Sequence, residues 1–410
     1  MHIMVALTLF VRVRILLRLP PKKQLFVRKA AFFMIYFKFP DFPLTTRIFC
    51  GLSVRLPKRG DPLENFEYIV QQHAARYPDM QPQDFGKLAY QSEFGPAHLS
   101  QNVDELTASL LREWAALPAD STVHPPEPVG NGLCRLYLDP HADASLAAPL
   151  LAKLMHRTMQ EHHGTADGLR RRIAVLQTLQ LPDMQAWLDH WEQEGFPPVH
   201  HSEAYRAACR PHYRLLRADL VGYFPALLAA ARLIQGGKPA VLAIDGRCGS
   251  GKSSLAQLLH ELFGCNVLHM DDFYLPFDER APDWTDRPAG NINLSRFRNE
   301  ALAPAAAGQS ILYRAYSCQQ GRYRDTAPLS PTPLTVAEGS YSHHPALADA
   351  YQCKVFLTCP DAVQARRLQA REGSHYAAFV DRWIPMEELY FRACGVPSSD
   401  TMVIDTGDFF

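Results

Sequence analysis

Apolar and polar positions follow different patterns in the two halves of the chain. Beyond about residue 238, short apolar runs alternate with stretches in which apolar residues recur at helical spacing. This alternation predicts an α/β fold in which a parallel sheet has helices on both of its faces. The runs that we expect to form strands are 240–244, 266–270, 334–337, 355–359 and 402–404.

The preceding part, residues 63–215, has mostly helical spacing and is expected to be an α-rich domain of unknown function. Residues 216–237 are expected to connect it to the second domain, 238–410, through a helix over about 224–233 with Pro225 in its first turn. One short strand is expected over residues 133–138. The predicted helices of the α-rich part are 64–76, 83–91, 103–116, 145–160, 168–180 and 184–194.

Residues 1–62 form a basic, apolar extension whose only acids are Asp41 and Asp61. Arg12, Arg14 and Arg18 interrupt its apolar stretch, which argues against a stable membrane span. We expect this segment to be non-native or disordered, for example through translation from an upstream start codon. A helix lying on a membrane surface is the alternative.

Composition narrows the classes of partner. Lys plus Arg and Asp plus Glu both number 42, so no overall basic charge favours nucleic acid. The nine cysteines show no paired metal or disulfide spacing, which favours a reducing, cytoplasmic location. The histidine pairs at 162–163, 200–201 and 343–344 lack zinc spacing and are expected at the surface or at helix ends. The polar and aromatic clusters at 91–98 and 201–214 suit an anion or a sugar, without an assigned chemistry.

Residues 241–256 contain the most specific motif, a Gly-x4-Gly-Lys-Ser phosphate loop between an apolar run and an amphipathic helix. Its glycines allow the backbone N–H groups to converge on phosphate oxygens at a helix N-terminus. Lys252 is expected to reach the terminal phosphates and Ser253 to bind Mg2+. The residues expected to bind the nucleotide are Gly246, Arg247, Cys248, Gly249, Ser250, Gly251, Lys252, Ser253 and Ser254.

Acids follow two of the predicted strands, and ligands of parallel sheets bind at that edge. Asp271, in Asp-Asp-Phe-Tyr, is placed to take a proton from an attacking hydroxyl. Glu338, in Glu-Gly-Ser-Tyr, offers the hard oxygen that Mg2+ prefers. With these motifs, residues 238–408 resemble the uridine kinase family of phosphate-loop kinases.

The resemblance implies a phosphate-loop NTPase fold, ATP and Mg2+ as cofactors, Asp271 acting on the acceptor hydroxyl, and Glu338 beside the metal. It also implies that arginines of the helix at 361–371 close on the phosphoryl group: Arg366, and with it Arg367 and Arg371 as catalytic residues. The acceptor loop, 286–291, differs from that of uridine kinases, so the acceptor stays open. The residues expected around it are Tyr274, Arg287, Asn291, Tyr316 and Arg322, with Tyr313 beside them.

These observations predict an ATP-dependent kinase that phosphorylates a hydroxyl of a small molecule, with a nucleoside such as uridine as the leading acceptor. A pantothenate or sugar kinase is the alternative within the same class. From another class, the chain could be a nucleotide-binding regulatory ATPase or switch. An Asn-Lys-x-Asp motif and a Leu-Ser-Gly-Gly-Gln signature are both absent. The sequence gives no indication of oligomeric state.

Overall fold

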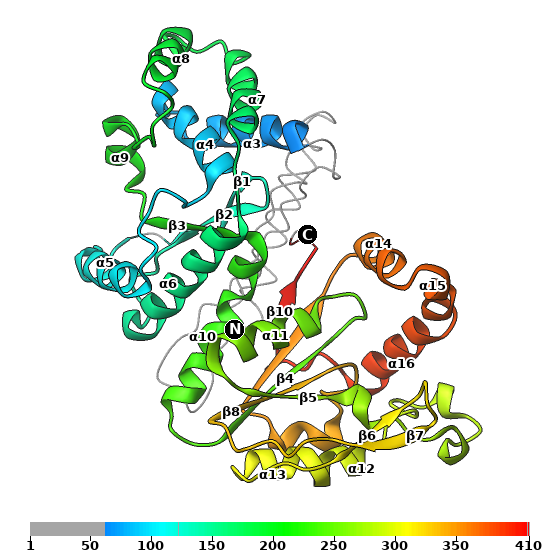
Figure 1. The fold of residues 1–410 in the computed structure, drawn as a ribbon. Coiled ribbons are helices and arrows are strands. Elements are labelled where there is room, and N and C mark those ends of the chain that lie inside the picture. The colour runs from blue at the N-terminus through cyan, green and yellow to red at the C-terminus, as the bar shows by residue number, and fades with distance from the viewer. Residues whose placement is uncertain (1–61, 122, 408, 410) are drawn as a thin grey trace, which may run out of the picture. The chain divides into compact units, whose positions relative to one another are not determined.

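The computed structural model describes residues 62–121, 123–407 and 409, so the expectation for residues 1–62 lies almost wholly outside the described part. A five-stranded sheet dominates the C-terminal half (Figure 1). All its neighbouring strands are parallel. In spatial order the strands are β10 (Met402–Asp405), β9 (Cys353–Thr358), β4 (Ala240–Gly246), β8 (Leu334–Glu338) and β5 (Asn266–His269).

Each of these strands overlaps an apolar run that predicted it, so the parallel α/β fold is confirmed for the C-terminal half. Strand β4 is buried along its whole length, and its alternating side chains contribute to two cores. Leu242 and Ile244 pack with β8, β9 and α11, whereas Val241 packs on the other side with Phe297 and Phe356. Strands β8 and β9 flank β4, and this is the switch point at which ligands bind such sheets.

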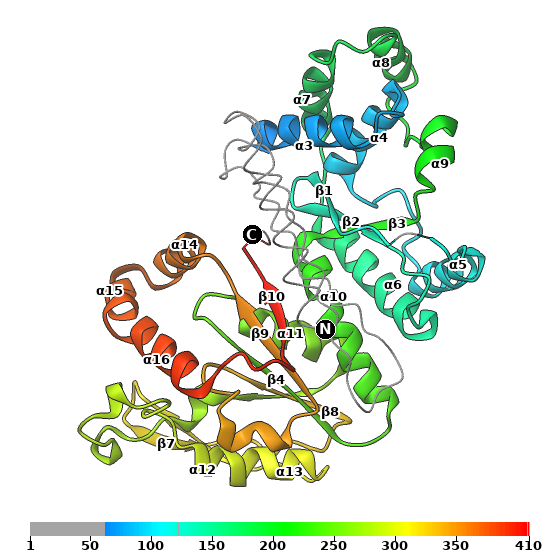
Figure 2. The ribbon, with the colours of Figure 1, turned by 180° about the vertical axis from the view of Figure 1, so that it is seen from behind.

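Helices and short turns connect these strands (Figures 1 and 2). The longer helices after β4 are α11 (Lys252–Phe263), α14 (Asp361–Glu372) and α16 (Ile384–Cys394), and a two-stranded hairpin joins β6 (Arg314–Ser317) to β7 (Arg322–Asp325). The short elements are η1 (Met270–Phe273), η2 (Phe277–Glu279), η3 (Trp284–Asp286), α12 (Leu294–Arg296), η4 (Phe297–Leu302), α13 (Ala303–Ala306), η5 (Pro345–Ala350), η6 (Gly373–His375), α15 (Tyr376–Ala378) and η7 (Phe379–Trp383).

The N-terminal half combines helices with a small antiparallel sheet in the order β1-β2-β3. The sheet consists of β1 (Glu127–Gly130), β2 (Leu133–Tyr137) and β3 (Tyr213–Arg217), of which the hydrophobic pattern had predicted only β2. The helices are α3 (Pro62–Arg76), α4 (Pro82–Phe94), α5 (Val103–Ala116), α6 (Ala144–Glu161), α7 (Ala166–Gln177), α8 (Met184–Gln193) and α9 (Glu203–Cys209), and α9 was also missed.

The connecting helix α10 (Ala218–Gln235) begins earlier than predicted, so Pro225 lies in the helix interior and not in its first turn. A proline there lacks the N–H that would bond to the carbonyl of Val221. The early turns are stabilised instead by burial of Leu220, Val221 and Tyr223. The apolar contacts of these side chains outweigh the cost of the lost hydrogen bond.

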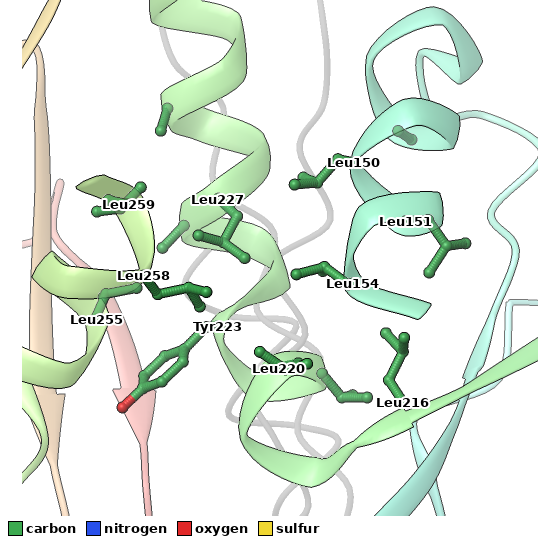
Figure 3. Close-up of a cluster of buried hydrophobic side chains, with 14 of the residues drawn as sticks. Leu150, Leu151, Leu154, Leu216, Leu220, Tyr223, Leu227, Leu255, Leu258 and Leu259 are labelled. Atoms are coloured by element: carbon green, nitrogen blue, oxygen red, sulfur yellow. The ribbon is translucent and has the colours of Figure 1, made fainter. Parts of the chain in front are cut away.

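Helix α10 packs against both halves of the described chain. Leu220 and Leu227 of α10 lie between Leu154 of α6 and Leu258 of α11 in one continuous buried cluster (Figure 3). An ion pair between Arg157 and Glu261 also links α6 to α11. The helical half and the phosphate-loop half therefore share a hydrophobic core, whereas the domain boundaries near residues 215 and 237 stay a prediction.

Among the described residues, no helix is both long and apolar enough to cross a membrane.

Candidate active site

The phosphate loop joins the carboxyl end of β4 to the N-terminus of α11, as its sequence predicted. Gly246 has φ 140°, and a Cβ atom there would lie 2.1 Å from the carbonyl oxygen of Leu357. Gly251 has φ 98°, and a Cβ atom there would lie 2.8 Å from the hydroxyl of Tyr223. Both positions require glycine for backbone conformation and for space.

The side chains of the loop suit an anion. The Lys252 ammonium donates to the carbonyl oxygens of Gly246 (2.7 Å) and Arg247 (3.1 Å), so it lies across the loop. The Ser250 hydroxyl is buried and has no hydrogen-bond partner in the described part of the chain. Together with the α11 N-terminus, these groups fit the phosphates of a nucleotide. Ser253 and Ser254 are exposed in the first turn of α11, while Gly249 is half-buried.

Helix α16 supports the loop from outside, through a residue that sequence reasoning did not select. The buried carboxylate of Glu387 accepts from the Cys248 backbone N–H (2.9 Å) and from the Ser340 hydroxyl (2.5 Å). Loss of hydration and the Glu387 charge raise the pKa of the Cys248 thiol. Glu388, the residue after Glu387, pairs with Arg247 (2.6 Å). The two adjacent acids, Glu387 and Glu388, were visible in the sequence, but spacing alone does not reveal which segment they contact.

The two residues expected to hold a metal lie together. The Ser253 hydroxyl is 3.4 Å from both carboxylate oxygens of Glu338. His269 also lies 2.6 Å from Glu338 through Nδ1, and the hydrogen bond to Glu338 raises the pKa of this histidine. A hydroxyl beside a carboxylate at the end of a strand fits Mg2+, which takes few protein ligands and keeps several waters. The donor set is therefore compatible with the expected cation.

Asp271 lies in η1, directly after β5. The residue stays open to solvent on one side, yet the surrounding protein and the charge of Glu338 raise its pKa, against the opposing effect of Lys252. Its carboxylate hydrogen-bonds the Tyr274 hydroxyl. Asp272 instead accepts from Tyr313 (2.9 Å). The structure thus brings Asp271, Lys252 and Glu338 within electrostatic reach of one another.

The expected lid arginines have different environments. Arg367 donates to the Gly249 carbonyl (3.2 Å) and to the backbone oxygen of Thr406 (2.6 Å), so it braces the loop and the segment after β10. Arg371 has a side chain that is 58% exposed, pairs with Glu372 (2.6 Å) and stacks on Phe379. Arg366 lies on the same helix, α14. In this structure Arg367 contacts the loop and Arg371 does not.

The residues expected around the acceptor also differ in burial and in their partners. Tyr274 contacts Asp271, and Tyr316 is buried in β6 against Tyr323. Arg287 pairs with Asp283 (2.8 Å) with its side chain 59% exposed, and Arg322 is exposed and donates to Gln320 (3.2 Å). Asn291 is fully buried, and neither atom of its side-chain amide has a partner in the described part of the chain.

The two polar clusters of the helical half meet in the fold. Arg135 donates to Gln91 (2.8 Å), Gln91 donates to the Tyr213 hydroxyl (3.0 Å), and Tyr213 lies 2.6 Å from His201. The other ring nitrogen of His201 lies 2.8 Å from Asp84. These contacts link α4, β2 and β3 with the segment before α9.

Two of the paired histidines correct the expectation of surface positions. His201 is 8% exposed and His343 is 5% exposed. Loss of hydration lowers the pKa of His201 to about 4, which keeps the imidazole neutral. The hydrophobic pattern could not reveal this, because the hydrogen-bond partners come from distant segments of the chain.

Comparison with known proteins finds similarity over part of this chain. No family model matches the chain. A nicotinamide riboside kinase of Schizosaccharomyces pombe is 26% identical over 160 residues, covering 33% of this chain and 68% of the relative.

Two solved structures also match. One is described as a possible uridine kinase from Bacillus stearothermophilus. It is 18% identical with a TM-score of 0.34, and the match covers 43% of this chain and 97% of the matched chain. The other, from Silicibacter sp. TM1040 and provisionally described as a fructose transport system kinase, has 19% identity and a TM-score of 0.35, covering 42% and 98%. With the phosphate loop at the switch point of a parallel sheet, the C-terminal half of this chain resembles the uridine kinase-like phosphate-loop kinases.

Proposed function

We propose that this protein is an ATP-dependent kinase that requires Mg2+ and phosphorylates a hydroxyl of a small molecule. The observation that carries the proposal is the position of Asp271. It lies at the end of β5, where Lys252 and Glu338 both act on its carboxylate. A carboxylate beside a phosphate loop is needed to activate an acceptor hydroxyl and is not required of a simple nucleotide switch.

Each site residue has a defined task in this proposal. Asp271 accepts the proton of the attacking hydroxyl, and its raised pKa moves it toward the range of a general base. Lys252 neutralises charge on the transferring phosphoryl group. Ser253 and Glu338 would hold Mg2+, which supplies further charge neutralisation when bound. Tyr274 orients the Asp271 carboxylate by its hydrogen bond.

A nucleoside is the proposed acceptor, with the ribose as the source of the hydroxyl. Support comes from the relative described as a nicotinamide riboside kinase, since nicotinamide riboside is a nucleoside. The ring of Tyr274, whose hydroxyl contacts Asp271, and the exposed ring of Phe277 offer aromatic surfaces on which a planar base could stack. A pantothenate or sugar acceptor remains the alternative to be tested beside it.

A regulatory role for the helical half has one contact in its favour. The Tyr223 hydroxyl of α10 lies 3.4 Å from the Gly251 carbonyl at the start of α11. Because α10 also packs on α6, a change in the helical half could reach the phosphate loop through this helix. This contact is compatible with a kinase as well as with a switch.

The deciding experiment measures ADP release from Mg-ATP with a panel of nucleosides, pantothenate and sugars. Asp271→Asn should lower acceptor-dependent kcat by about 10²–10⁴-fold while ATP binding persists, because only proton transfer is removed. Lys252→Ala should lower it as well. Arg170→Gln, an exposed change on α7, is the control. ATP binding with no acceptor-dependent turnover in the wild-type protein would contradict the kinase and favour the switch.

A further inference from the structure

Arg280 is held in a box of aromatic side chains beside the candidate active site. Its guanidinium carbon lies 4.1 Å from the ring centre of Phe277, 4.9 Å from that of Trp284 and 6.0 Å from that of Tyr274. Its Nε donates to the Leu275 carbonyl (3.0 Å). Three rings and one backbone bond thus restrict a side chain that would otherwise lose much rotamer freedom on binding a ligand.

The charge of Arg280 has no acidic partner among the ion pairs of the described residues. Other arginines in this half do pair with acids, for example Arg287 with Asp283 and Arg296 with Glu300. Apart from the Nε bond, the contact found for the guanidinium is a weak one from Nη2 to the Cys318 sulfur (4.0 Å). Most donors of the planar fork are therefore available to a ligand.

Arg280 is also close to the residue proposed to activate the acceptor. Tyr274 connects them, because its hydroxyl bonds Asp271 and its ring faces Arg280. Cys318, which follows β6, is influenced by both charges: burial raises its thiol pKa, Arg280 lowers it and Asp271 raises it. Phe277, the closest ring to Arg280, is 63% exposed, so this side of the box is open to solvent.

We infer that Arg280 binds an anionic group, a carboxylate or a phosphate, on the acceptor whose hydroxyl lies at Asp271. This inference rests on the proposed kinase function and specifies its substrate class. An arginine fork binds carboxylates and phosphates through two parallel hydrogen bonds, and a fork fixed in advance loses less entropy on binding. The same charge disfavours a cationic base, so the relative described as a nicotinamide riboside kinase supports a nucleoside as the class of acceptor and not nicotinamide riboside itself.

The test uses pairs of acceptors that differ in one acidic group. Suitable pairs are orotidine with uridine, nicotinic acid riboside with nicotinamide riboside, and pantothenate with its alcohol, panthenol. The measurement is kcat/KM for each acceptor at saturating Mg-ATP. We expect the acidic member of the pair that fits the site to be preferred by tenfold or more, mainly through a lower KM.

Variants of Arg280 separate its charge from its packing. Arg280→Met retains an unbranched stem against Phe277 and Trp284 but removes the fork, so it should raise the KM for the acidic acceptor by tenfold or more and abolish the preference. Arg280→Lys keeps the charge as a point and should retain only part of the preference. Arg170→Gln is the surface control, and an unchanged melting temperature excludes misfolding.

The outcomes distinguish the two proposals. Turnover of the neutral and acidic members at equal kcat/KM, unchanged in Arg280→Met, would overturn the role of Arg280 while leaving the kinase intact. A preference for the acidic member that persists in Arg280→Met would assign the anion to another residue and overturn the inference as well. Absence of turnover with every acceptor would contradict the kinase proposal itself, on which the inference depends.

Discussion

The two halves of the described chain both bury polar groups, but they use them differently. In the helical half, the carboxylate of Glu127 receives hydrogen bonds from Arg135 (3.0 Å), Tyr77 (2.7 Å) and Tyr137 (3.2 Å). In the phosphate-loop half, the hydrogen bonds of Lys252 to described residues go to carbonyls of its own loop, and the buried Ser250 hydroxyl has no partner among those residues.

This difference distinguishes a structural role of the helical half from a ligand-binding role of the phosphate-loop half. A buried network whose members satisfy one another fixes the positions of the elements that carry it, at a high cost if one partner is lost. Unmet polar groups at the end of a sheet, in contrast, are available to a ligand. The helical half is not perfectly satisfied, since Tyr205 has a buried hydroxyl without a partner in the described residues.

The largest expected effect is on the stability of the helical half. Arg135→Met should lower the free energy of unfolding by about 3–5 kcal/mol, because Glu127 would keep a buried charge without its main partner. Urea denaturation followed by circular dichroism measures this change. The double variant Arg135→Met/Glu127→Gln should recover part of the loss. A loss below about 1 kcal/mol in the single variant would show that this network is not a scaffold.

A corresponding change in the phosphate-loop half, Lys252→Ala, should lower activity and leave stability nearly unchanged. Lys252→Ala should reduce turnover by about 10²–10³-fold, since the charge acts on the transferring group. Because the hydrogen bonds of Lys252 to described residues stay within its own loop, the free energy of unfolding without nucleotide should change by less than about 0.5 kcal/mol. A large loss of stability here would remove the distinction between the halves.

The network should also make the protein sensitive to acid. Burial lowers the pKa of His73 and of His201 to about 4, below the ordinary value of 6.5. The unfolded chain therefore binds protons first, and stability should fall as the pH decreases from about 6.5 toward 4. The loss should be on the order of 3 kcal/mol for each histidine, since one pKa unit corresponds to about 1.4 kcal/mol.

A second loss of stability is expected at a lower pH than the first. The pKa of Glu127, lowered to about 2 by Arg135 and other partners against the effect of burial, adds a loss as the pH falls from about 4.5 toward 2. Urea denaturation at several pH values measures both arms. His201→Gln should flatten the arm between pH 6.5 and 4, and an unchanged slope would contradict a neutral, buried His201.

The smallest effect concerns the contact between the halves. Tyr223→Phe removes a long hydrogen bond to Gly251, so stability should fall by less than about 1 kcal/mol. If α10 transmits a signal, the KM for ATP should change more than stability does. Leu228→Val, a conservative change at a half-buried position on the same helix, serves as the comparison. Equal ATP parameters in both variants and the wild type would argue against transmission through Tyr223.

Local patterns were sufficient for much of the phosphate-loop half. Short apolar runs predicted all five strands of the parallel sheet but not the hairpin strands β6 and β7; the signal is clearest for β4 and β8, which are buried along their whole length and therefore largely apolar. The loop motif and the acids Asp271 and Glu338 could also be recognised from local sequence. Each comes directly after a predicted strand, at the edge where ligands bind parallel sheets. The sequence thus determined the sheet, the nucleotide-binding loop and the main candidate residues.

Other features were decided only by tertiary structure. The start of α10 depends on the burial of Leu220 and Tyr223, which local propensity does not record and which outweighs the effect of Pro225. The support that Glu387 gives to Cys248 and the link from Gln91 to Tyr213 both join residues that are far apart in sequence. Periodicity indicates which side of an element is buried, but only packing determines which distant side chain lies opposite.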